Sequence, residues 1–310
     1  MKILVTGGAG YIGSILVPDL LDEGHEVTVL DNFLYRQASL NHVCSHPNFN
    51  VVRGDIRVEE AIRPLLKNHD VIIPLAALVG APLCQQDPVG AQTVNHDAMV
   101  MMLRLLSKDQ WVIMPTTNSA YGSGGNGNYC DEESPLNPLS KYAIDKVAVE
   151  QQLLEHPNAI SFRLATVFGM SPRMRLDLLV NDFTYRAVVE KCVVLFESSF
   201  KRNYIHVRDV SLAFRHAIKE FKIMNSNIYN VGLSDANISK LELCHAIKKE
   251  VPEFVIIEEK FKSDPDKRNY LVSNQKIEKT GYKPLVKLGQ GIRELIKGYT
   301  MLQPKRYSNV

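Results

Sequence analysis

The first thirteen residues constrain the fold more than any other stretch of the chain. Residues 2–6 form a short apolar run with β-branched side chains, which is typical of a strand buried on both faces. This run leads into a glycine-rich turn, residues 7–13, and apolar side chains at helical spacing follow at once: Ile12, Ile15, Leu16 and Leu20. Strand, glycine turn and helix in this order are the setting in which such a turn binds a dinucleotide.

The glycines of this turn let backbone N–H groups approach a pyrophosphate, and the helix N-terminus adds a partial positive charge. A second apolar run, residues 26–30, ends in Asp31, where a carboxylate would accept the adenine ribose hydroxyls and repel a 2′-phosphate. We therefore expect NAD rather than NADP. The alternative is a tight turn in which Asp31 is an ordinary cap. The predicted cofactor contacts here are Gly7, Gly10, Tyr11, Ile12, Gly13, Asp31 and Asn32.

Length and composition narrow the class of protein. With 310 residues the chain can form two domains or one large α/β unit. The net charge of +2 leaves no basic footprint for nucleic acid. Five scattered cysteines argue against a disulfide framework or a zinc site and for a reducing compartment. The chain opens on its first strand and has no membrane-length apolar run, so we expect a cytoplasmic protein. We also expect no bound metal.

Strands alternate with helices through about residue 170, which predicts a parallel, doubly wound sheet with right-handed crossovers. The further predicted strands of this part are residues 49–53, 70–74, 111–115 and 159–163. Beyond it the pattern is less regular, and short strands separate three helices. The fold class is therefore α/β, with a Rossmann-type domain over 1–170, to which some later segments return, and a smaller substrate-binding lobe over 171–310.

Several loops follow the predicted strands at the edge where a ligand would bind. Asp55 and Ile56 could hold the adenine amino group and one ring face, although Asp55 is equally well read as a helix cap. Small residues after the fourth strand would let a cofactor lie against backbone: Leu75, Ala76 and Ala77. The apolar loop 79–84, which contains Val79 and Gly80, is either a wall of the substrate pocket or simple packing.

Tyr142 and Lys146 lie four residues apart on one face of a predicted helix, and Thr117 follows the fifth strand. Lowering the pKa of a phenol by about three units takes roughly 4 kcal/mol. An ammonium about 4 Å away contributes about 1 kcal/mol in water but about 4 kcal/mol at an effective dielectric constant near 20. The pair can therefore work only in a desolvated cleft, where Thr117 would hold a substrate hydroxyl while Tyr142 removes its proton.

The chain resembles the extended short-chain dehydrogenase/reductase family over almost its whole length, and within it the enzymes that act on nucleotide sugars. The resemblance rests on the glycine turn and on Asp31, Asp55, Ile56, Asn95, Thr117, Tyr142 and Lys146. It implies that the threonine, tyrosine and lysine oxidise a sugar hydroxyl, usually at position 4, with NAD. The implied cofactor contacts then also include Asn95, Thr116, Tyr142 and Lys146.

The resemblance also implies a substrate site. Arg202 matches the family arginine that contacts the diphosphate, and Arg268 is the candidate for its partner, because the usual Arg-Pro-Gly-Asp motif is replaced by residues 263–268. Thr166 would lie by the sugar and Asn181 by the nucleotide, and Asn181 is equally well read as a polar residue of a helical turn. The predicted substrate contacts are Val79, Gly80, Thr117, Asn118, Thr166, Asn181, Arg202 and Arg268. Family members commonly form homodimers through two helices per subunit.

One departure from the family and one further resemblance narrow the reaction. Dehydratases carry an Asp-Glu pair after the catalytic threonine, whereas this chain has Asn118 and Ser119, so we predict no dehydration. Residues 73–84, 163–175 and 264–268 resemble a subgroup that includes GDP-manno-heptose 4-dehydrogenases of capsule synthesis. We therefore expect 4-oxidation of a GDP-linked heptose or related sugar. A nucleotide-sugar 4-epimerase is the first alternative, and a non-catalytic NAD-binding sensor is the second.

Overall fold

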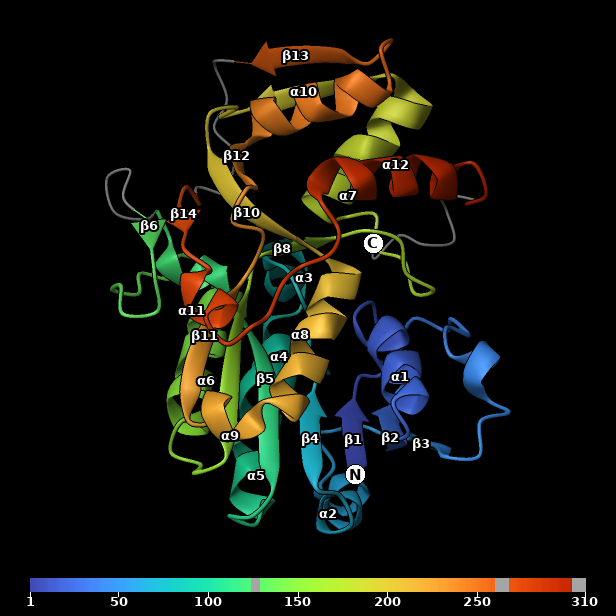
Figure 1. Ribbon diagram of the computed structural model, residues 1–310, viewed down its shortest axis with the longest axis vertical. Coiled ribbons are helices and arrows are strands. Elements are labelled where there is room, and N and C mark those ends of the chain that lie inside the picture. Colours follow the sequence, from blue (N-terminus) through green and yellow to red (C-terminus); the bar gives the residue numbers. More distant parts are fainter. Residues whose placement is uncertain (124–128, 260–267, 303–310) are drawn as a thin grey trace.

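The computed structural model describes residues 1–123, 129–259 and 268–302. Its centre is a seven-stranded parallel sheet in the order β11-β7-β5-β4-β1-β2-β3 (Figure 1). The strands are β1 (Lys2–Thr6), β2 (Glu26–Asp31), β3 (Phe49–Arg53), β4 (Val71–Pro74), β5 (Trp111–Thr117), β7 (Ala159–Leu164) and β11 (Asn227–Val231). The predicted Rossmann-type parallel sheet is confirmed, and its edge strand β11 comes from beyond residue 170.

Helices cover both faces of this sheet. Ile3 and Val5 of β1 pack on the face covered by α1 (Gly13–Asp22) and α8 (Val207–Lys219), whereas Leu4 faces the opposite layer. That second layer contains α2 (Glu59–Lys67), α5 (Ala98–Leu105) and α6 (Lys141–Leu153). Successive side chains of a central strand are buried against one helix layer and then the other, which explains why these strands are continuous hydrophobic runs.

A smaller lobe stands over the carboxyl ends of the strands (Figure 1). It contains the three-stranded sheet β12-β10-β8 and the pairs β13-β9 and β14-β6. These strands are β6 (Tyr129–Cys130), β8 (Thr166–Phe168), β9 (Cys192–Phe196), β10 (Lys201–His206), β12 (Asn237–Ser239), β13 (Val255–Glu259) and β14 (Leu271–Val272). Its main helices are α7 (Leu179–Tyr185), α10 (Lys240–Glu250) and α12 (Leu288–Tyr299).

Local signals explain several helix boundaries. Ser140 begins α6 by accepting a hydrogen bond from the Ala143 backbone N–H, and Ser239 begins α10 with a reciprocal capping box. The remaining helical segments are α3 (Ala81–Gln86), α4 (Pro88–Gln92), α9 (Phe221–Met224), α11 (Gln275–Glu278), the 3-10 turns η1 (Asn41–Val43) and η3 (Asn118–Tyr121), and the π-helical turns η2 (Thr93–Asp97) and η4 (Arg186–Glu190).

Two expectations for this part of the chain were wrong in detail. The predicted loop 79–84 runs into α3, because Gly80 at φ +106 turns the chain and Pro82 fits the first helical turn. The helical spacing of the apolar side chains from Met99 to Leu106 predicts a helix that opens at Asn95, but the helical segment begins earlier, at α4, and Asn95 lies in the π-helical turn η2. The sequence also predicts a surface tail from Gln303 and a glycine-rich loop that ends at Asn128. The tail and residues 124–128 of the loop lie outside the described residues.

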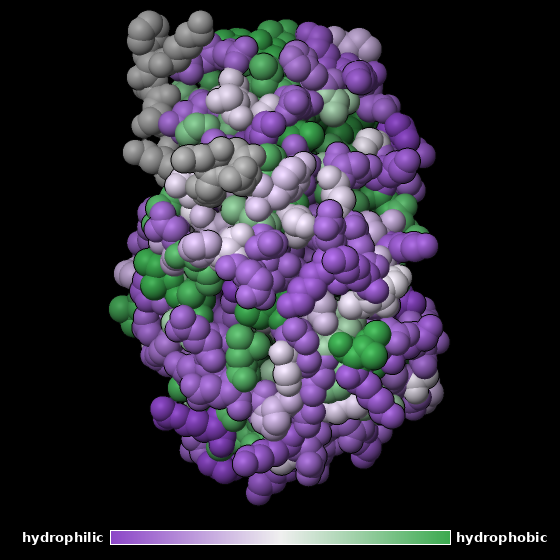
Figure 2. All heavy atoms as spheres, turned by 60° about the vertical axis from the view of Figure 1, so that its left-hand side comes forward, coloured by the Kyte–Doolittle hydropathy of each residue, from purple (hydrophilic) through white to green (hydrophobic). Residues whose placement is uncertain are grey.

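The described surface is mixed in polarity. Figure 2 shows a largely hydrophilic face on which hydrophobic side chains form scattered patches. None of the helices in the described ranges combines the length and apolar character that a membrane span requires.

Candidate active site

The glycine turn lies against the backbone of the loop that follows β4. Gly7 has φ +68, and a Cβ there would lie 2.5 Å from the Ala76 backbone nitrogen, so only glycine fits. The Leu75 N–H donates to the Thr6 carbonyl at 2.9 Å, and the Gly7 N–H donates to the Leu30 carbonyl at 2.8 Å. The turn thus presents backbone without side chains at the start of α1, which is the cradle that a pyrophosphate requires.

Asp31 is fixed beside this turn. Its carboxylate accepts hydrogen bonds from the Ala9 N–H at 3.0 Å and the Phe33 N–H at 2.7 Å. Together with the open turn, this carboxylate fits the adenine ribose of NAD. Next to it, the Asn32 side chain accepts from the Leu34 N–H at 3.0 Å.

Other predicted cofactor residues have structural partners of their own. The Asp55 carboxylate is held by Arg57, through the backbone N–H at 2.9 Å and Nε at 3.0 Å, and Ile56 is buried in the second layer. Asn95 is fully buried and fixes the loop after β4, since its amide exchanges two hydrogen bonds with the Leu78 backbone at 2.8 and 2.9 Å. The contacts predicted from Asp55 and Asn95 to NAD remain predictions.

Thr117, Tyr142 and Lys146 come from adjacent elements. Thr117 ends β5, and α6, which carries the other two, packs against β5 and the turn η3. Thr117 Oγ1 accepts from the Ser119 N–H at 3.1 Å, and Lys146 Nζ donates to the Pro115 carbonyl at 3.4 Å. Thr116 points elsewhere: its hydroxyl donates to the buried Glu150 carboxylate at 2.9 Å.

The electrostatics of the trio differ from the expectation. Burial raises the pKa of Tyr142 to about 12, and the charges that oppose this rise are those of Arg175 and Arg268, not Lys146. Burial also lowers the pKa of Lys146 to about 8, against the influence of Cys84 and Asp145. Lys146 is desolvated as predicted, but in this structure guanidinium groups supply the positive potential at the phenol.

The two arginines expected at a diphosphate lie on neighbouring segments. Arg202 on β10 is 2% exposed, and its guanidinium carbon is 5.7 Å from the centre of the Tyr270 ring. Arg268 donates to the Ser119 hydroxyl. Burial raises the pKa of the Tyr204 phenol, and the charges of Arg202 and Arg268 both oppose that rise. Residues 263–267 of the motif lie outside the described residues.

Thr166 and Asn181 have different surroundings. Thr166 lies on β8 opposite Tyr204, beside the arginines. Asn181 is fully buried, and its side chain bonds the Gly169 N–H at 3.0 Å, the Arg175 carbonyl at 2.8 Å and the Tyr11 hydroxyl at 3.2 Å. Its side chain thus joins the glycine turn to the smaller lobe, and the predicted contact with a nucleotide remains a prediction.

Three residues at this edge were missed from the sequence. Arg173 is 2% exposed, and its guanidinium carbon is 3.8 Å from the centre of the Tyr35 ring, in the loop after Asp31. Arg175 pairs with Asp177 and donates to the Val79 carbonyl at 3.5 Å. The third is Cys84, whose thiol pKa burial raises. Two arginines in the loop after β8 were the available signal.

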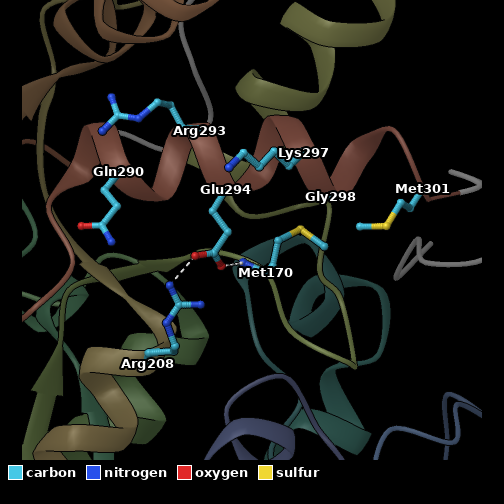
Figure 3. Close-up of a pocket in the computed structure, with 8 residues that line it drawn as sticks. All are labelled: Met170, Arg208, Gln290, Arg293, Glu294, Lys297, Gly298 and Met301. Carbon is cyan, nitrogen blue, oxygen red and sulfur yellow. Dashed lines mark hydrogen bonds and ion pairs between the residues drawn. The ribbon is translucent and has the colours of Figure 1, made fainter.

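A hollow of about 560 Å³ lies outside this cluster, between α12 and the turn after β8 (Figure 3). Glu294 lies at its centre, where it pairs with Arg208 and accepts from the Met170 N–H at 3.2 Å. Although burial opposes it, the bonds from His206 and Arg208 lower the pKa of Glu294 to about 2. None of the predicted site residues lines this hollow, so it is separate from the candidate site.

Comparisons with known proteins identify the family of this chain. Residues 3–232 match the model of the NAD dependent epimerase/dehydratase family. The chain is 27% identical to UDP-glucuronic acid decarboxylase 1 of Danio rerio, over 96% of this chain and 72% of that protein. It is 25% identical to the Thermus thermophilus UDP-glucose 4-epimerase solved with NAD, with a TM-score of 0.82 and coverage of 97% and 99%.

The fold also matches a Bacillus cereus UDP-glucuronic acid 4-epimerase solved with UDP-glucuronic acid and NAD. Here the TM-score is 0.86 at 24% identity, with 98% of this chain and 100% of that chain covered. The family match spans the glycine turn, Asp31 and the helix carrying Tyr142. The chain therefore belongs to the NAD dependent epimerase/dehydratase family, and it is an enzyme whose cofactor is NAD.

Proposed function

We propose that this enzyme oxidises the 4-hydroxyl of a nucleotide-linked sugar. The observation that carries the proposal is that α6, which carries Tyr142 and Lys146, packs against β5 and η3, where Thr117 ends the strand. A residue set that only bound NAD would need neither this phenol nor a desolvated ammonium. The family membership of the chain supports this assignment.

Each member of the trio has a chemical task. Thr117 holds the sugar hydroxyl, and Tyr142 takes its proton as the hydride leaves the same carbon. Bound NAD accepts that hydride and adds positive charge beside the phenol. With a pKa of about 12, the phenol must become about five units more acidic to act as a phenolate at neutral pH. That change corresponds to about 7 kcal/mol.

Arg175 and Arg268 already oppose the rise of this pKa, so the value of about 12 includes their effect. The further lowering has to come from other positive charges. Lys146 lies on the same helix face as Tyr142, and bound NAD adds a second positive charge. Unit charges about 6 Å apart interact by about 3 kcal/mol at an effective dielectric constant of 20, so two such interactions would approach the required amount.

The substrate is proposed from its binding groups. Arg202 and Arg268 form a pair suited to a diphosphate, which guanidinium groups bind through two parallel hydrogen bonds. The Danio rerio and Thermus thermophilus relatives are named for UDP-sugars, which supports a nucleotide sugar here. The sequence resemblance favours a GDP-linked heptose or a related sugar, used for polysaccharide precursors.

The outcome after oxidation separates two candidates. Release of the ketone makes the enzyme a 4-dehydrogenase, and return of the hydride to the other face makes it a 4-epimerase. The likeness to the Thermus thermophilus epimerase favours the second candidate. Asn118 and Ser119 can neither give nor take a proton at neutral pH, so dehydration is not proposed.

A panel of GDP-, UDP- and dTDP-sugars tests the proposal, with products identified by mass spectrometry and NMR. Loss of two hydrogens identifies a dehydrogenase, and unchanged mass with inverted stereochemistry identifies an epimerase. Tyr142→Phe should lose at least about a hundredfold in turnover while NAD binding is retained. Full activity of this variant would refute the role of Tyr142.

We also propose that the chain is a homodimer. Apolar side chains are exposed on and beside α6, with Ile144 at 47% and Leu139 at 51% exposure. Light scattering coupled to gel filtration measures the mass directly. A monomer at assay concentration would contradict this proposal.

A further inference from the structure

Asn118 carries a buried amide that the protein itself does not satisfy. The residue is 1% exposed, and within the described ranges neither Nδ2 nor Oδ1 has a hydrogen-bond partner. A buried amide without partners destabilises the fold, and such groups are rare in native proteins. The presence of two unpaired atoms on one side chain therefore requires an explanation.

Other buried asparagines show what the fold provides. Asn95 bonds the Leu78 backbone through both of its side-chain atoms. Asn230 accepts from the Tyr121 hydroxyl at 2.8 Å and donates to the Ser273 carbonyl at 3.1 Å. Asn181 likewise uses both atoms. Asn274 has no partner for Oδ1 among the described residues, but its Nδ2 donates to the Asn203 side chain at 3.3 Å. Asn118 differs from these residues because both of its side-chain atoms lack a partner in the part of the chain that the structure describes.

Asn118 itself lies at the candidate site, between two residues of that site. It follows Thr117 directly and begins η3, which packs against the helix carrying Tyr142. The next residue, Ser119, donates its N–H to Thr117 Oγ1 and accepts from Arg268. The unpaired amide thus lies in the one turn that links the proposed hydroxyl-binding residue to an arginine acting on the phenol.

We propose that Asn118 is a specificity-determining residue whose amide binds a neutral, hydroxylated part of the sugar. The inference rests on the proposed function, and it names the class of sugar. A hydroxyl group can accept from Nδ2 and donate to Oδ1, which satisfies both atoms. A carboxylate can only accept, so it would leave Oδ1 buried and unpaired. The site therefore selects neutral sugars against uronic acids, unlike the relatives named for UDP-glucuronic acid.

The test compares Asn118→Ala with Asn230→Ala. In the nucleotide-free protein, Asn118→Ala should leave the melting temperature unchanged or raise it, because the lost amide had no partner. Asn230→Ala should lower the melting temperature, because it removes the acceptor for the Tyr121 hydroxyl proton and the donor to the Ser273 carbonyl. With the neutral nucleotide sugar accepted in the panel, Asn118→Ala should raise KM and the calorimetric Kd at least about tenfold. Asn230→Ala should leave both unchanged.

Substrate pairs provide the second arm: UDP-glucose with UDP-glucuronic acid, and GDP-mannose with GDP-mannuronic acid. The wild-type enzyme should favour the neutral member by kcat/KM at least about tenfold. Equal use of both members, or an Asn118→Ala variant that melts lower and binds as wild type, would overturn the role of Asn118 and leave 4-oxidation standing. Failure of the wild-type enzyme to bind or convert any nucleotide sugar would overturn both proposals.

Discussion

Replacing Lys146 by methionine should stabilise the nucleotide-free enzyme while destroying its activity. The side chain is 4% exposed, and burial lowers the pKa of its ammonium from 10.5 to about 8. The difference, 10.5 − 8, is a shift of about 2.5 units, equivalent to about 3 kcal/mol. Methionine has a similar length and no charge, so the variant escapes this desolvation cost.

The sign of the pH dependence follows from the direction of the shift. Below pH 8 the lysine is charged in both the folded and unfolded states, and the folded state bears the whole cost. Between pH 8 and 10.5 the folded state has lost the proton and the unfolded state still holds it, so wild-type stability gains on the variant as pH rises. The electrostatic part of the advantage of Lys146→Met should therefore fall from about 3 kcal/mol at pH 7 to about 1 kcal/mol at pH 10.

Urea unfolding of both proteins at pH 7, 8.5 and 10 measures this difference. The hydrogen bond to the Pro115 carbonyl is also lost, which costs about 1 kcal/mol but does not vary with pH over this range. Lys249→Met on α10 is the control, because this side chain is exposed and should show a small, constant effect. A difference between Lys146→Met and wild type that stays constant with pH would refute the reasoning.

Three further changes test the cofactor turn, a buried ion pair and a helix cap. Gly7→Ala places a Cβ 2.5 Å from the Ala76 nitrogen at φ +68, so we expect NAD to bind at least about tenfold more weakly by calorimetry; an unchanged Kd would count against the cradle. Glu150→Gln leaves the buried Arg163 without its carboxylate, and urea unfolding should show a loss of about 3–5 kcal/mol. Ser239→Ala removes the capping box of α10 and should cost about 1 kcal/mol in the same assay; no loss would mean that the cap is redundant.

The core of the fold could be predicted because its signals are local. Strands β1 and β3, for example, begin at Lys2 and Phe49, as the sequence predicted. The glycine turn and Asp31 were also predictable, since the backbone at Gly7 admits no side chain. The start of α6 is equally local, because serine favours helix N-termini and Ser140 accepts from the Ala143 N–H of the first turn.

Features that depend on distant partners could not be predicted in this way. Arg175 acts on Tyr142, yet the two lie on different elements and no spacing in the chain joins them. Asn181 could be placed near the site, but its bonds to Gly169 and Tyr11 exist only once the two lobes meet. The π-helical turn at Asn95 depends on bonds to Leu78 across the packed layer.

The return of the chain to its first sheet has a practical consequence for protein engineering. Strand β11 hydrogen-bonds with β7 along Asn227–Val231, and α8 packs against α1 on one face of the same sheet. A recombinant fragment that stopped near residue 170 would expose the edge of β7 and the apolar side of α1, and both promote aggregation. Anyone who grafts this cofactor module onto another sugar-binding partner has to transplant residues 207–231 with it.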